Sequence, residues 1–590
     1  MANGSAFLGA VSDEVKCRHV FNLGILRFKI WWMMPQMGKS GSDVPVETQM
    51  LLLEAKDESD VNNRTIDEFE SSTYYILFLP VLDGNFRSSL QGKSTDELEF
   101  CIESGDPAVE AAEFYEAVFV NYGSNPFELM KESMKILSKH KGTFSVRENK
   151  KYPGSLDWFG WCTWDAFYHA VNPQGIKEGL KRFGARLNSI KENSKFGKGT
   201  DTDMNGSTGS LKDFITDIKK TFSLKYVYLW HALMGYWGGL NPNAQGTNKY
   251  NAKLLYPVQS PGNLSHIRDL AMDRMEISNA SAITRASDDY YPKNPASQTL
   301  HIATVAFNSI FLGEIVVPDW DMFYSDHYAA EFHAVARALG GCGVYVSDKP
   351  GKHDFKLLKR LVLPNGAVLR AKYPGRPTRD CLFNDPIMDG KSLLKIWNLN
   401  TYSGVLGVFN CQGAGTWPCL DNVKNDSDAT PSNLTGCVSP SNIEYLEEVA
   451  GDNWTGDCAV FSFNSGSLSR LPNKGSLNVS LKVLQCDVFT ISPIKRYGEK
   501  IQFAPIGLIN MYNSGGAVEA IEFVINDSNC QVKIKGRGSG HFGAYSSTNP
   551  KFCMVNSKEE EFEYKVDEKF LTITVPHGNN FWEIDVAFVA

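Results

Sequence analysis

The segment TRASDDYYPKNPAS, residues 284–297, combines a basic side chain, two adjacent carboxylates and two tyrosines with prolines that favour turns. Arg285 lies four residues before Asp289, the second of the two aspartates. A group of this kind is either a loop that caps a helix or an acid in a binding cleft. The segments WCTWD (161–165) and DWD (319–321) mix aromatic and acidic residues in the same way.

The residue types in these segments suit a sugar ligand. Sugars present apolar C–H faces that stack on aromatic rings, and their vicinal hydroxyls form paired hydrogen bonds with carboxylates. Arg285, Asp288 and Asp289 could supply a hydroxyl clamp and a proton donor. Each residue alone reads as a core aromatic or a helix cap, and only the grouping favours a binding site. The candidate sugar-binding residues are Trp164, Asp165, Trp230, His231, Trp237, Arg285, Asp319, Trp320 and Asp321.

Strands that alternate with helices must position these residues. Between residues 157 and 352, short apolar runs end in polar, aromatic or acidic residues, as in KYVYLWHALMGYW and FLGEIVVPDWDMF, and helical periodicity lies between the runs. Such alternation predicts parallel βαβ units. Functional side chains at the carboxyl ends of the strands favour a (β/α)8 barrel. A doubly wound sheet is the alternative, but no Gly-rich phosphate loop supports it.

Strand patterns dominate on both sides of the alternating part. Before it, strand-like runs occur at 27–33 and 73–82, and Asn125 begins the one clear helix. After it, apolar runs separated by Asn, Gly and Ser are typical of a β-sandwich. The predicted fold class is therefore α/β plus β. Its domains are an N-terminal β-rich domain at 1–150, a (β/α) barrel at 151–390 and a C-terminal β-sandwich at 391–590.

The composition excludes several classes of protein. The net charge is −8 and there is no basic run, so no nucleic acid is expected as a partner. No apolar run is long enough to span a membrane, and the first residues lack the pattern of a secretion signal. The 12 cysteines show neither a CxxC pair nor zinc-like spacing, which indicates reduced thiols and no metal site. The expected location is the cytoplasm.

Six segments together resemble a known family: DWFGWCTWDAF, YVYLWHALMGYWGG, YPVQSPGNL, RASDDYYPKNPASQTLHIA, PDWDMF and YVSDKPGKHDFKLLKRL. They look like plant raffinose synthases, and in particular their seed imbibition branch, which includes alkaline α-galactosidases of glycoside hydrolase family 36. The resemblance runs from about Arg27 to Ser547. It implies a (β/α)8 barrel between β domains that transfers or hydrolyses α-galactosyl groups with retention, without a cofactor.

The resemblance also implies roles for individual residues. Retention requires two carboxyl groups about 5 Å apart, one as nucleophile and one as acid/base. The family places an arginine four residues before the acid/base, which selects Asp289 over Asp288 as that residue. Arg285 would then bind a galactose hydroxyl, and Trp164 matches the galactose-facing tryptophan.

Two segments of the family pattern are missing. The nucleophile strand, which ends DGVKVD in the family, has no counterpart between Leu264 and Arg285. The strand ending DDGW has none after NPQGIKEGL. A βα unit takes about 30 residues, so neither gap can hold one. Asp269 and Asp273 lie nearby, but they are interpreted as exposed positions on a helix and are not expected to replace the nucleophile. The barrel is therefore predicted to be incomplete, with strands near 156–164, 225–231, 281–288, 312–318 and 342–347.

Three functions follow from this interpretation. The first is a galactinol–sucrose galactosyltransferase that makes raffinose, and the second is an alkaline α-galactosidase that hydrolyses raffinose-family sugars. The third is a silent sugar-binding protein or a misfolded variant, because the nucleophile segment is missing. The expected partners are galactinol, sucrose and raffinose. A nucleotide-dependent transferase is disfavoured, because DWD at 319–321 reads as a barrel strand end and not as a metal-binding motif.

Overall fold

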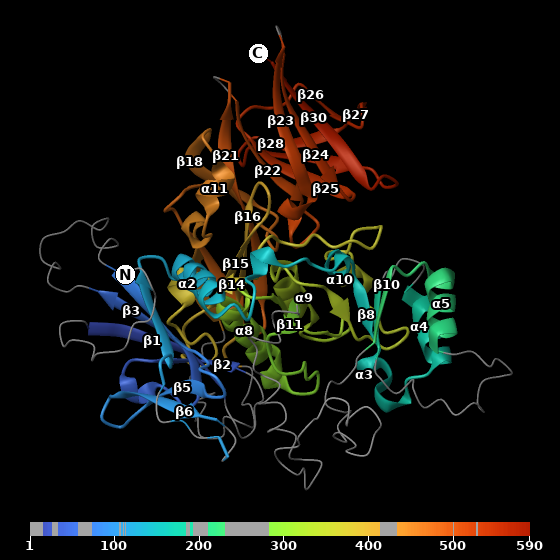
Figure 1. The fold of residues 1–590 in the computed structure, drawn as a ribbon. Helices are drawn as coiled ribbons and strands as arrows, with labels where there is room; N and C mark the ends of the chain where they lie inside the picture. The colour runs from blue at the N-terminus through green and yellow to red at the C-terminus, as the bar shows by residue number, and fades with distance from the viewer. Residues whose placement is uncertain are drawn as a thin grey trace, which may run out of the picture.

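The computed structural model describes residues 16–25, 33–56, 73–104, 108–109, 111, 114–183, 189–192, 211–229, 282–413, 433–498, 501–526 and 529–589. In chain order it comprises an N-terminal sheet, a middle part of short parallel strands with helices, and a C-terminal part of long antiparallel strands (Figure 1). No helix of these residues is long and apolar enough to cross a membrane.

The N-terminal part is a seven-stranded antiparallel sheet followed by one helix. The sheet comprises β1 (Lys16–Ile25), β2 (Met33–Gly38), β3 (Thr48–Lys56), β4 (Thr73–Pro80), β5 (Arg87–Gly92), β6 (Leu98–Glu103) and β7 (Val118–Gly123). The prediction of a strand at 73–82 is confirmed by β4, whereas most of the predicted strand 27–33 lies outside the described residues. The predicted helix is α2 (Pro126–Lys141), which the Asn125 side chain caps by accepting from two backbone N–H groups.

The middle part contains six parallel strands among the residues described. Four form a sheet in the order β10 (Tyr226–Leu229), β9 (Ser189–Glu192), β8 (Gly160–Cys162) and β13 (Tyr345–Val346). The other two, β11 (Ile283–Arg285) and β12 (Val317–Asp319), pair with each other. A parallel bridge between Phe323 and Val346 connects the loop after β12 to β13. The helices of this part are α3 (Trp164–Phe167), α4 (Pro173–Phe183), α5 (Leu211–Phe222), α8 (Pro295–Leu312), α9 (Ala330–Leu339) and α10 (Phe355–Leu358).

All five predicted strands are present, but the count of five was wrong because β9 lies between β8 and β10. The expectation that the gap after NPQGIKEGL cannot hold a βα unit was also wrong, because β9 and α5 follow α4 and precede β10. The β9 sequence, SIKE, contains one apolar residue, so it gives no hydrophobic signal. Its backbone hydrogen bonds to two neighbouring strands are what define it.

Helix α8 is the centre of the packing. Every residue from Ala296 to Leu312 is buried, as expected for a helix that is surrounded on all sides. The Asn308 amide donates to the Met33 carbonyl of β2 at 2.8 Å and to the Ala286 carbonyl after β11 at 2.6 Å. This side chain therefore ties the N-terminal sheet to the segment that carries Asp288 and Asp289.

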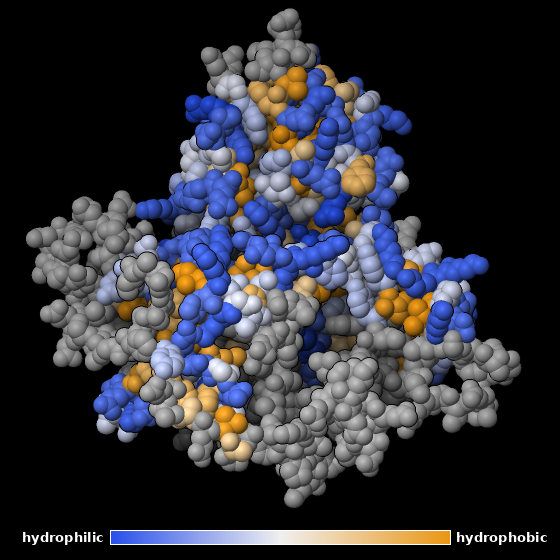
Figure 2. Space-filling view, in the orientation of Figure 1, coloured by the Kyte–Doolittle hydropathy of each residue, from blue (hydrophilic) through white to orange (hydrophobic). Residues whose placement is uncertain are grey.

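The C-terminal part is rich in strands, as predicted. A ten-stranded sheet contains β14 (Arg376–Pro377), β15 (Leu394–Leu399), β16 (Gly404–Phe409), β18 (Trp454–Ser462), β19 (Leu468–Pro472), β21 (Cys486–Tyr497), β22 (Ile501–Leu508), β25 (Gly540–Ser546), β28 (Phe562–Lys565) and β29 (Phe570–Val575). A five-stranded sheet contains β23 (Val518–Asn526), β24 (Asn529–Arg537), β26 (Phe552–Val555), β27 (Lys558–Glu560) and β30 (Phe581–Val589). Strands β17 (Asn433–Val438) and β20 (Leu477–Lys482) pair separately, and one short helix, α11 (Leu446–Ala450), was not predicted. The visible face of this part is mostly hydrophilic, with smaller hydrophobic patches (Figure 2).

Candidate functional site

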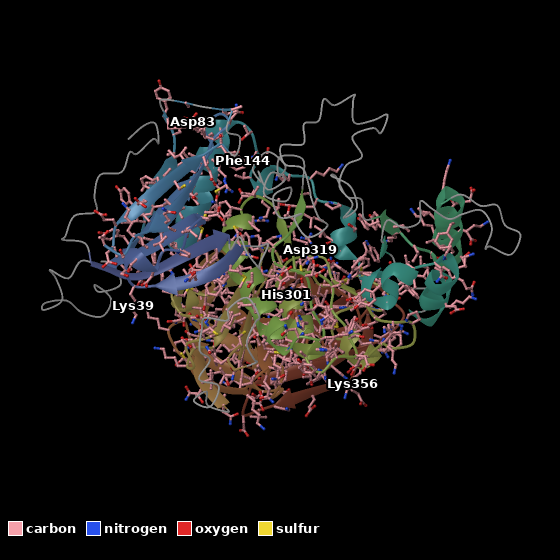
Figure 3. All side chains as sticks on the ribbon, turned by 90° about the horizontal axis from the view of Figure 1, so that it is seen from below. Lys39, Asp83, Phe144, His301, Asp319 and Lys356 are labelled. Atoms are coloured by element: carbon pink, nitrogen blue, oxygen red, sulfur yellow. The ribbon has the colours of Figure 1, made fainter. Side chains whose placement is uncertain are left out.

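The carboxyl ends of the parallel strands bring most of the described candidate residues together. Arg285 ends β11, Asp319 ends β12, and the two residues are partners in the parallel register. Asp165 follows β8 in the short helix α3. Figure 3 shows Asp319 near the centre of the molecule, with the N-terminal sheet on one side and α4 and α5 on the other. The described candidate residues therefore gather at the strand ends of the middle part of the chain.

Arg285 joins three of the aspartates. Its Nη2 lies 2.8 Å from Asp321 Oδ2 and 3.0 Å from Asp289 Oδ1, and it also donates to the Asp288 carbonyl at 3.2 Å. The two carboxylates differ in access, because the side chain of Asp321 is 3% exposed and that of Asp289 is 59% exposed. Arg285 thus holds one buried carboxylate and one that solvent can reach.

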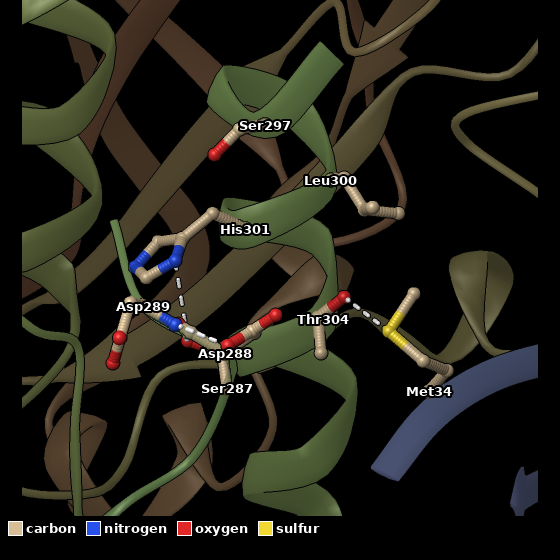
Figure 4. A pocket seen from close by; sticks show the side chains of 8 residues that line it. All are labelled: Met34, Ser287, Asp288, Asp289, Ser297, Leu300, His301 and Thr304. Carbon is tan, nitrogen blue, oxygen red and sulfur yellow. Dashed lines mark hydrogen bonds between the residues drawn. The ribbon is translucent and has the colours of Figure 1, made fainter. Parts of the chain in front are cut away.

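Asp288 and Asp289 point in opposite directions (Figure 4). Asp288 Oδ1 accepts from the Asp289 backbone N–H at 2.8 Å and from the Tyr291 hydroxyl at 3.3 Å. Burial raises the pKa of Asp288. Both aspartates line a small pocket of about 20 Å³ with Met34, Ser287, Ser297, Leu300, His301 and Thr304. The accessible carboxylate beside the arginine is therefore that of Asp289.

Tyr345 is a site residue that sequence reasoning missed. Its hydroxyl lies 3.1 and 2.9 Å from the two carboxylate oxygens of Asp319 and 3.4 Å from Asp321 Oδ1. Burial raises the pKa of Tyr345 well above its ordinary value, and the charges of Asp319 and Asp321 act in the same direction. The phenol therefore stays protonated and donates to the carboxylates. The only signal in the sequence was its position in the apolar run CGVYVSDK.

Asp165 is a buried carboxyl at the end of β8. It is 2% exposed, and Ser347 Oγ donates to its Oδ2 at 2.8 Å. Burial raises the pKa of Asp165 to about 6, and the negative charges of Asp321 and Asp289 contribute to the rise. Trp164, which precedes it, is half-buried and meets the Tyr168 ring edge-on at 5.8 Å.

We expect Asp165→Asn to stabilise the protein at pH 8 by about 2–3 kcal/mol and to change little at pH 4. The folded-state pKa lies above the unfolded value, so the stability from protonation is present below about pH 4 and is lost as the pH rises through about 6. Asparagine imitates the protonated acid at every pH. Urea unfolding of both proteins across this range measures the difference. Asp326→Asn, at an exposed aspartate, is the control and should leave the profile unchanged.

Trp320 does not face the site. It is fully buried, and an added Cβ at Gly340 would meet its Nε1 at 2.7 Å, so its indole packs among the helices. The prediction that it binds sugar assumed that the whole DWD segment faces the ligand. Successive side chains of an extended segment point to opposite sides, which puts Asp319 and Trp320 on different faces. The same alternation returns Asp321 to the side of Asp319. The backbone at Asp321 is left-handed, with φ 62°.

Arg337 of α9 stabilises the left-handed backbone at Asp321. It is 1% exposed, and its five N–H groups find acceptors within one cluster. Nε donates to the Asp321 carbonyl at 3.1 Å, and Nη2 donates to the carbonyls of Trp320 at 2.6 Å and Met322 at 3.2 Å. Nη1 lies 3.0 Å from both Nδ1 and the carbonyl oxygen of His333. One side chain therefore fixes three successive carbonyls around Asp321.

The hydrogen bonds also fix the tautomers of two buried histidines. His333 Nδ1 accepts from Arg337, so its Nε2–H donates to Gln298 Oε1 at 2.7 Å. His301 Nε2 donates to the Trp320 carbonyl at 2.9 Å, which leaves Nδ1 without a proton, 3.2 Å from the oxygen of Ser287, whose hydroxyl donates to the Asp288 carbonyl at 2.8 Å. Burial, together with the charge of Arg337, lowers the pKa of His301 to about 4. Both rings are therefore uncharged and position their neighbours through hydrogen bonds. Neither histidine was predicted from the sequence.

A cavity of about 340 Å³ lies between the two sets of parallel strands. Its volume is within the range of about 300–1,000 Å³ that is common for ligand pockets. It is lined by Ser155, Leu156, Trp158, Gly160, Trp161, Tyr228, Ile283, Arg285, Asp319, Gly343, Val344 and Tyr345. In a closed (β/α)8 barrel, side chains fill this space.

Other sequence-predicted residues lie outside the described part of the chain. These are Trp230, His231 and Trp237 among the candidate binding residues, and Asp269 and Asp273 among the possible substitutes for the nucleophile. Within the described residues, no group of three or more His, Cys, Asp or Glu side chains could hold a metal ion.

The parallel strands, their covering helices and the strand-end carboxylates define a protein with a TIM-like domain and β-rich domains. The chain belongs to the family described as raffinose synthase or seed imbibition protein Sip1, whose model matches residues 1–184, 181–279 and 276–575.

Its relatives include two galactosyltransferases. The "Probable galactinol--sucrose galactosyltransferase 1" of Arabidopsis thaliana is 39% identical over 709 positions, which cover 97% of this chain and 92% of the relative. The "Galactinol--sucrose galactosyltransferase" of Pisum sativum is 33% identical, covering 95% of this chain and 86% of the relative. Among solved structures, α-galactosidase I from Mortierella vinacea has a TM-score of 0.34 at 12% identity, covering 57% of this chain and 97% of its own.

The family match is divided at two places. Its three parts meet at 181–184 and at 276–279, where the sequence predicted missing segments. The alignment with the Arabidopsis relative runs over 709 positions although this chain has only 590 residues, so more than a hundred aligned positions have no counterpart here.

Proposed function

We propose that this chain is a galactinol–sucrose galactosyltransferase-type protein whose site binds α-galactosyl sugars. The observation that carries the proposal is the cluster in which Arg285 holds the accessible Asp289 and the buried Asp321 at the strand ends of a raffinose synthase family member. Galactinol would be the galactosyl donor and sucrose the acceptor, as the names of the relatives suggest.

Asp289 is suited to the acid/base role in this proposal. In retaining transfer, such a residue gives its proton to the leaving oxygen while a second carboxylate attacks the anomeric carbon. It then accepts the proton of the acceptor hydroxyl as that hydroxyl displaces the carboxylate. Asp289 is more than half exposed and faces away from Asp288, so a sugar can reach it. Arg285, Asp165 and Asp319 would contact sugar hydroxyls.

The same proposal includes an incomplete barrel between the domains 1–150 and 391–590. The two breaks in the family match and the cavity between the strand sets support it. The C-terminal sandwich is supported by a shared core, to which Phe503 and Leu571 of the ten-stranded sheet contribute with Val532 and Ile584 of the five-stranded sheet. A cytoplasmic location completes the proposal.

Because the nucleophile strand of the family pattern lies at the second break, we expect sugar binding with little transfer. Loss of one member of a cooperating catalytic pair typically lowers the rate by about 10³-fold or more. The purified chain, given galactinol with sucrose and then galactinol alone, should form raffinose at least about 10³-fold more slowly than the pea relative. Calorimetry should still detect galactose binding, and Asp289→Asn should weaken it.

The outcomes separate the candidate functions. Raffinose formed at a rate near that of the pea relative would show that another carboxylate acts as nucleophile, contrary to the expected loss. Galactose released without raffinose would favour the hydrolase. A protein that melts cooperatively but binds no sugar would reject the proposed function altogether.

A further inference from the structure

Three tyrosines are exposed on loops at the carboxyl ends of the parallel strands. Tyr168 is 40% exposed after β8, Tyr291 is 38% exposed after β11, and Tyr328 is 65% exposed after β12. They lie on the same loops as Asp165, Asp289 and Asp321. Exposed aromatic rings grouped around a polar site often mark a binding surface, and tyrosine offers both an apolar face and a hydroxyl.

Tyr328 is the most exposed of the three and is nevertheless held in place. Its ring lies 4.2 Å from the His327 ring at an interplanar angle of 36°. His327 is fixed at both ring nitrogens, because Nε2 donates to the Pro292 carbonyl at 2.9 Å and Nδ1 accepts from the Ala329 backbone N–H at 3.2 Å. Tyr328 therefore contacts a ring that is itself held by two hydrogen bonds, which limits the freedom that its own ring would lose when a ligand stacks on it.

His327, which Tyr328 contacts, is hydrogen-bonded to the loop that carries Asp289. Pro292, which accepts from His327, lies three residues after Asp289, and the Tyr290 ring contacts the rings of Tyr324 at 5.9 Å and His327 at 6.3 Å. The aromatic contacts thus connect the loops after β11 and β12.

We propose that Tyr328, packed against His327, is the platform for a second sugar ring, on the far side of the glycosidic oxygen from the galactose. Its occupant would be the sucrose portion of raffinose, or sucrose as the incoming acceptor. The inference rests on the proposed function, because it assumes that galactose lies beside Arg285 and Asp289. The apolar face of the ring would lie on Tyr328, while its hydroxyls would remain accessible to water and to the polar atoms of the loops.

The test is calorimetric binding of raffinose and of galactose to the full chain and to three variants. The parent should bind raffinose more tightly than galactose. Tyr328→Ala should weaken raffinose binding by about tenfold and leave galactose binding within about twofold, because one aromatic stacking contact is lost. Tyr328→Phe keeps the ring and should stay within about twofold for both sugars. Tyr122→Ala, at a 67% exposed tyrosine of the N-terminal sheet, is the matched control and should change neither affinity.

Different results overturn different statements. If the parent binds galactose but prefers raffinose no more than Tyr328→Ala does, the platform is rejected and the proposed function stands. If Tyr328→Phe weakens raffinose binding as much as Tyr328→Ala, the hydroxyl rather than the ring face carries the contact, and the stacking platform is rejected. A parent that binds neither sugar overturns the proposed function and the platform with it.

Discussion

Arg337→Met is expected to lower the free energy of unfolding by about 3–5 kcal/mol, because it removes five N–H donors from a buried site. The carbonyls of Trp320, Asp321 and Met322 would lose this partner. A buried acceptor left without a donor costs about 1–3 kcal/mol, and removal of the buried charge offsets part of the sum. Urea unfolding followed by fluorescence and circular dichroism measures the change.

The same substitution should also weaken galactose binding. The left-handed backbone of Asp321 costs free energy that its surroundings must supply, and Arg337 holds the carbonyls on either side of it. Without that support the Asp321 carboxylate should shift away from Arg285. Arg337→Lys keeps the charge but cannot bind three carbonyls at once, so we expect an intermediate loss of both stability and affinity.

Arg360→Met is the matched control. Arg360 is 31% exposed and pairs with Glu331 at 2.7 Å and with the Tyr512 hydroxyl at 3.2 Å. A partly exposed pair of this kind contributes about 1 kcal/mol, so its loss should be smaller than that of the buried Arg337. If Arg337→Met unfolds at the same urea concentration as Arg360→Met, the cluster around Asp321 does not depend on Arg337 for its stability.

Much of the middle part could be predicted because its strands are short apolar runs that end in polar residues. This pattern located β8, β10, β11, β12 and β13, and it placed Arg285 and Asp319 at strand ends. Strand β9 was missed because its residues are mostly polar, and parallel pairing between neighbours defines it instead of burial. Local hydrophobicity therefore predicts a strand only where the residues of that strand are themselves apolar.

The buried residues that support the site, Arg337 and His333, were harder to predict than its strand-end residues. Arg337 and His333 are separated by four residues on α9, which places them on one face of an apolar helix. This spacing is a signal, but a buried arginine cannot be told from an exposed one without knowing what covers the helix. The misplacement of Trp320 has a different cause, because side chains alternate along an extended segment and Trp320 therefore points away from Asp319.

A chimera that restores the missing segments should gain activity. We would insert into this chain, at 181–184 and at 276–279, the corresponding segments of the pea galactinol–sucrose galactosyltransferase. If the family resemblance is right, the second insertion supplies the nucleophile carboxylate that pairs with Asp289. Raffinose formation from galactinol and sucrose should then rise by about 10³-fold or more over the parent chain, since both members of a cooperating pair are needed for the rate.

Two further chimeras identify the source of any gain. The double chimera with Asp289→Asn should return to the parent rate, because the acid/base would then be absent. The single chimera with only the first insertion should form no more raffinose than the parent, because it does not add the nucleophile. A double chimera that melts cooperatively, binds raffinose and still transfers no faster than the parent would contradict the assignment of Asp289. The defect would then lie in the described site itself and not in the segments that this chain lacks.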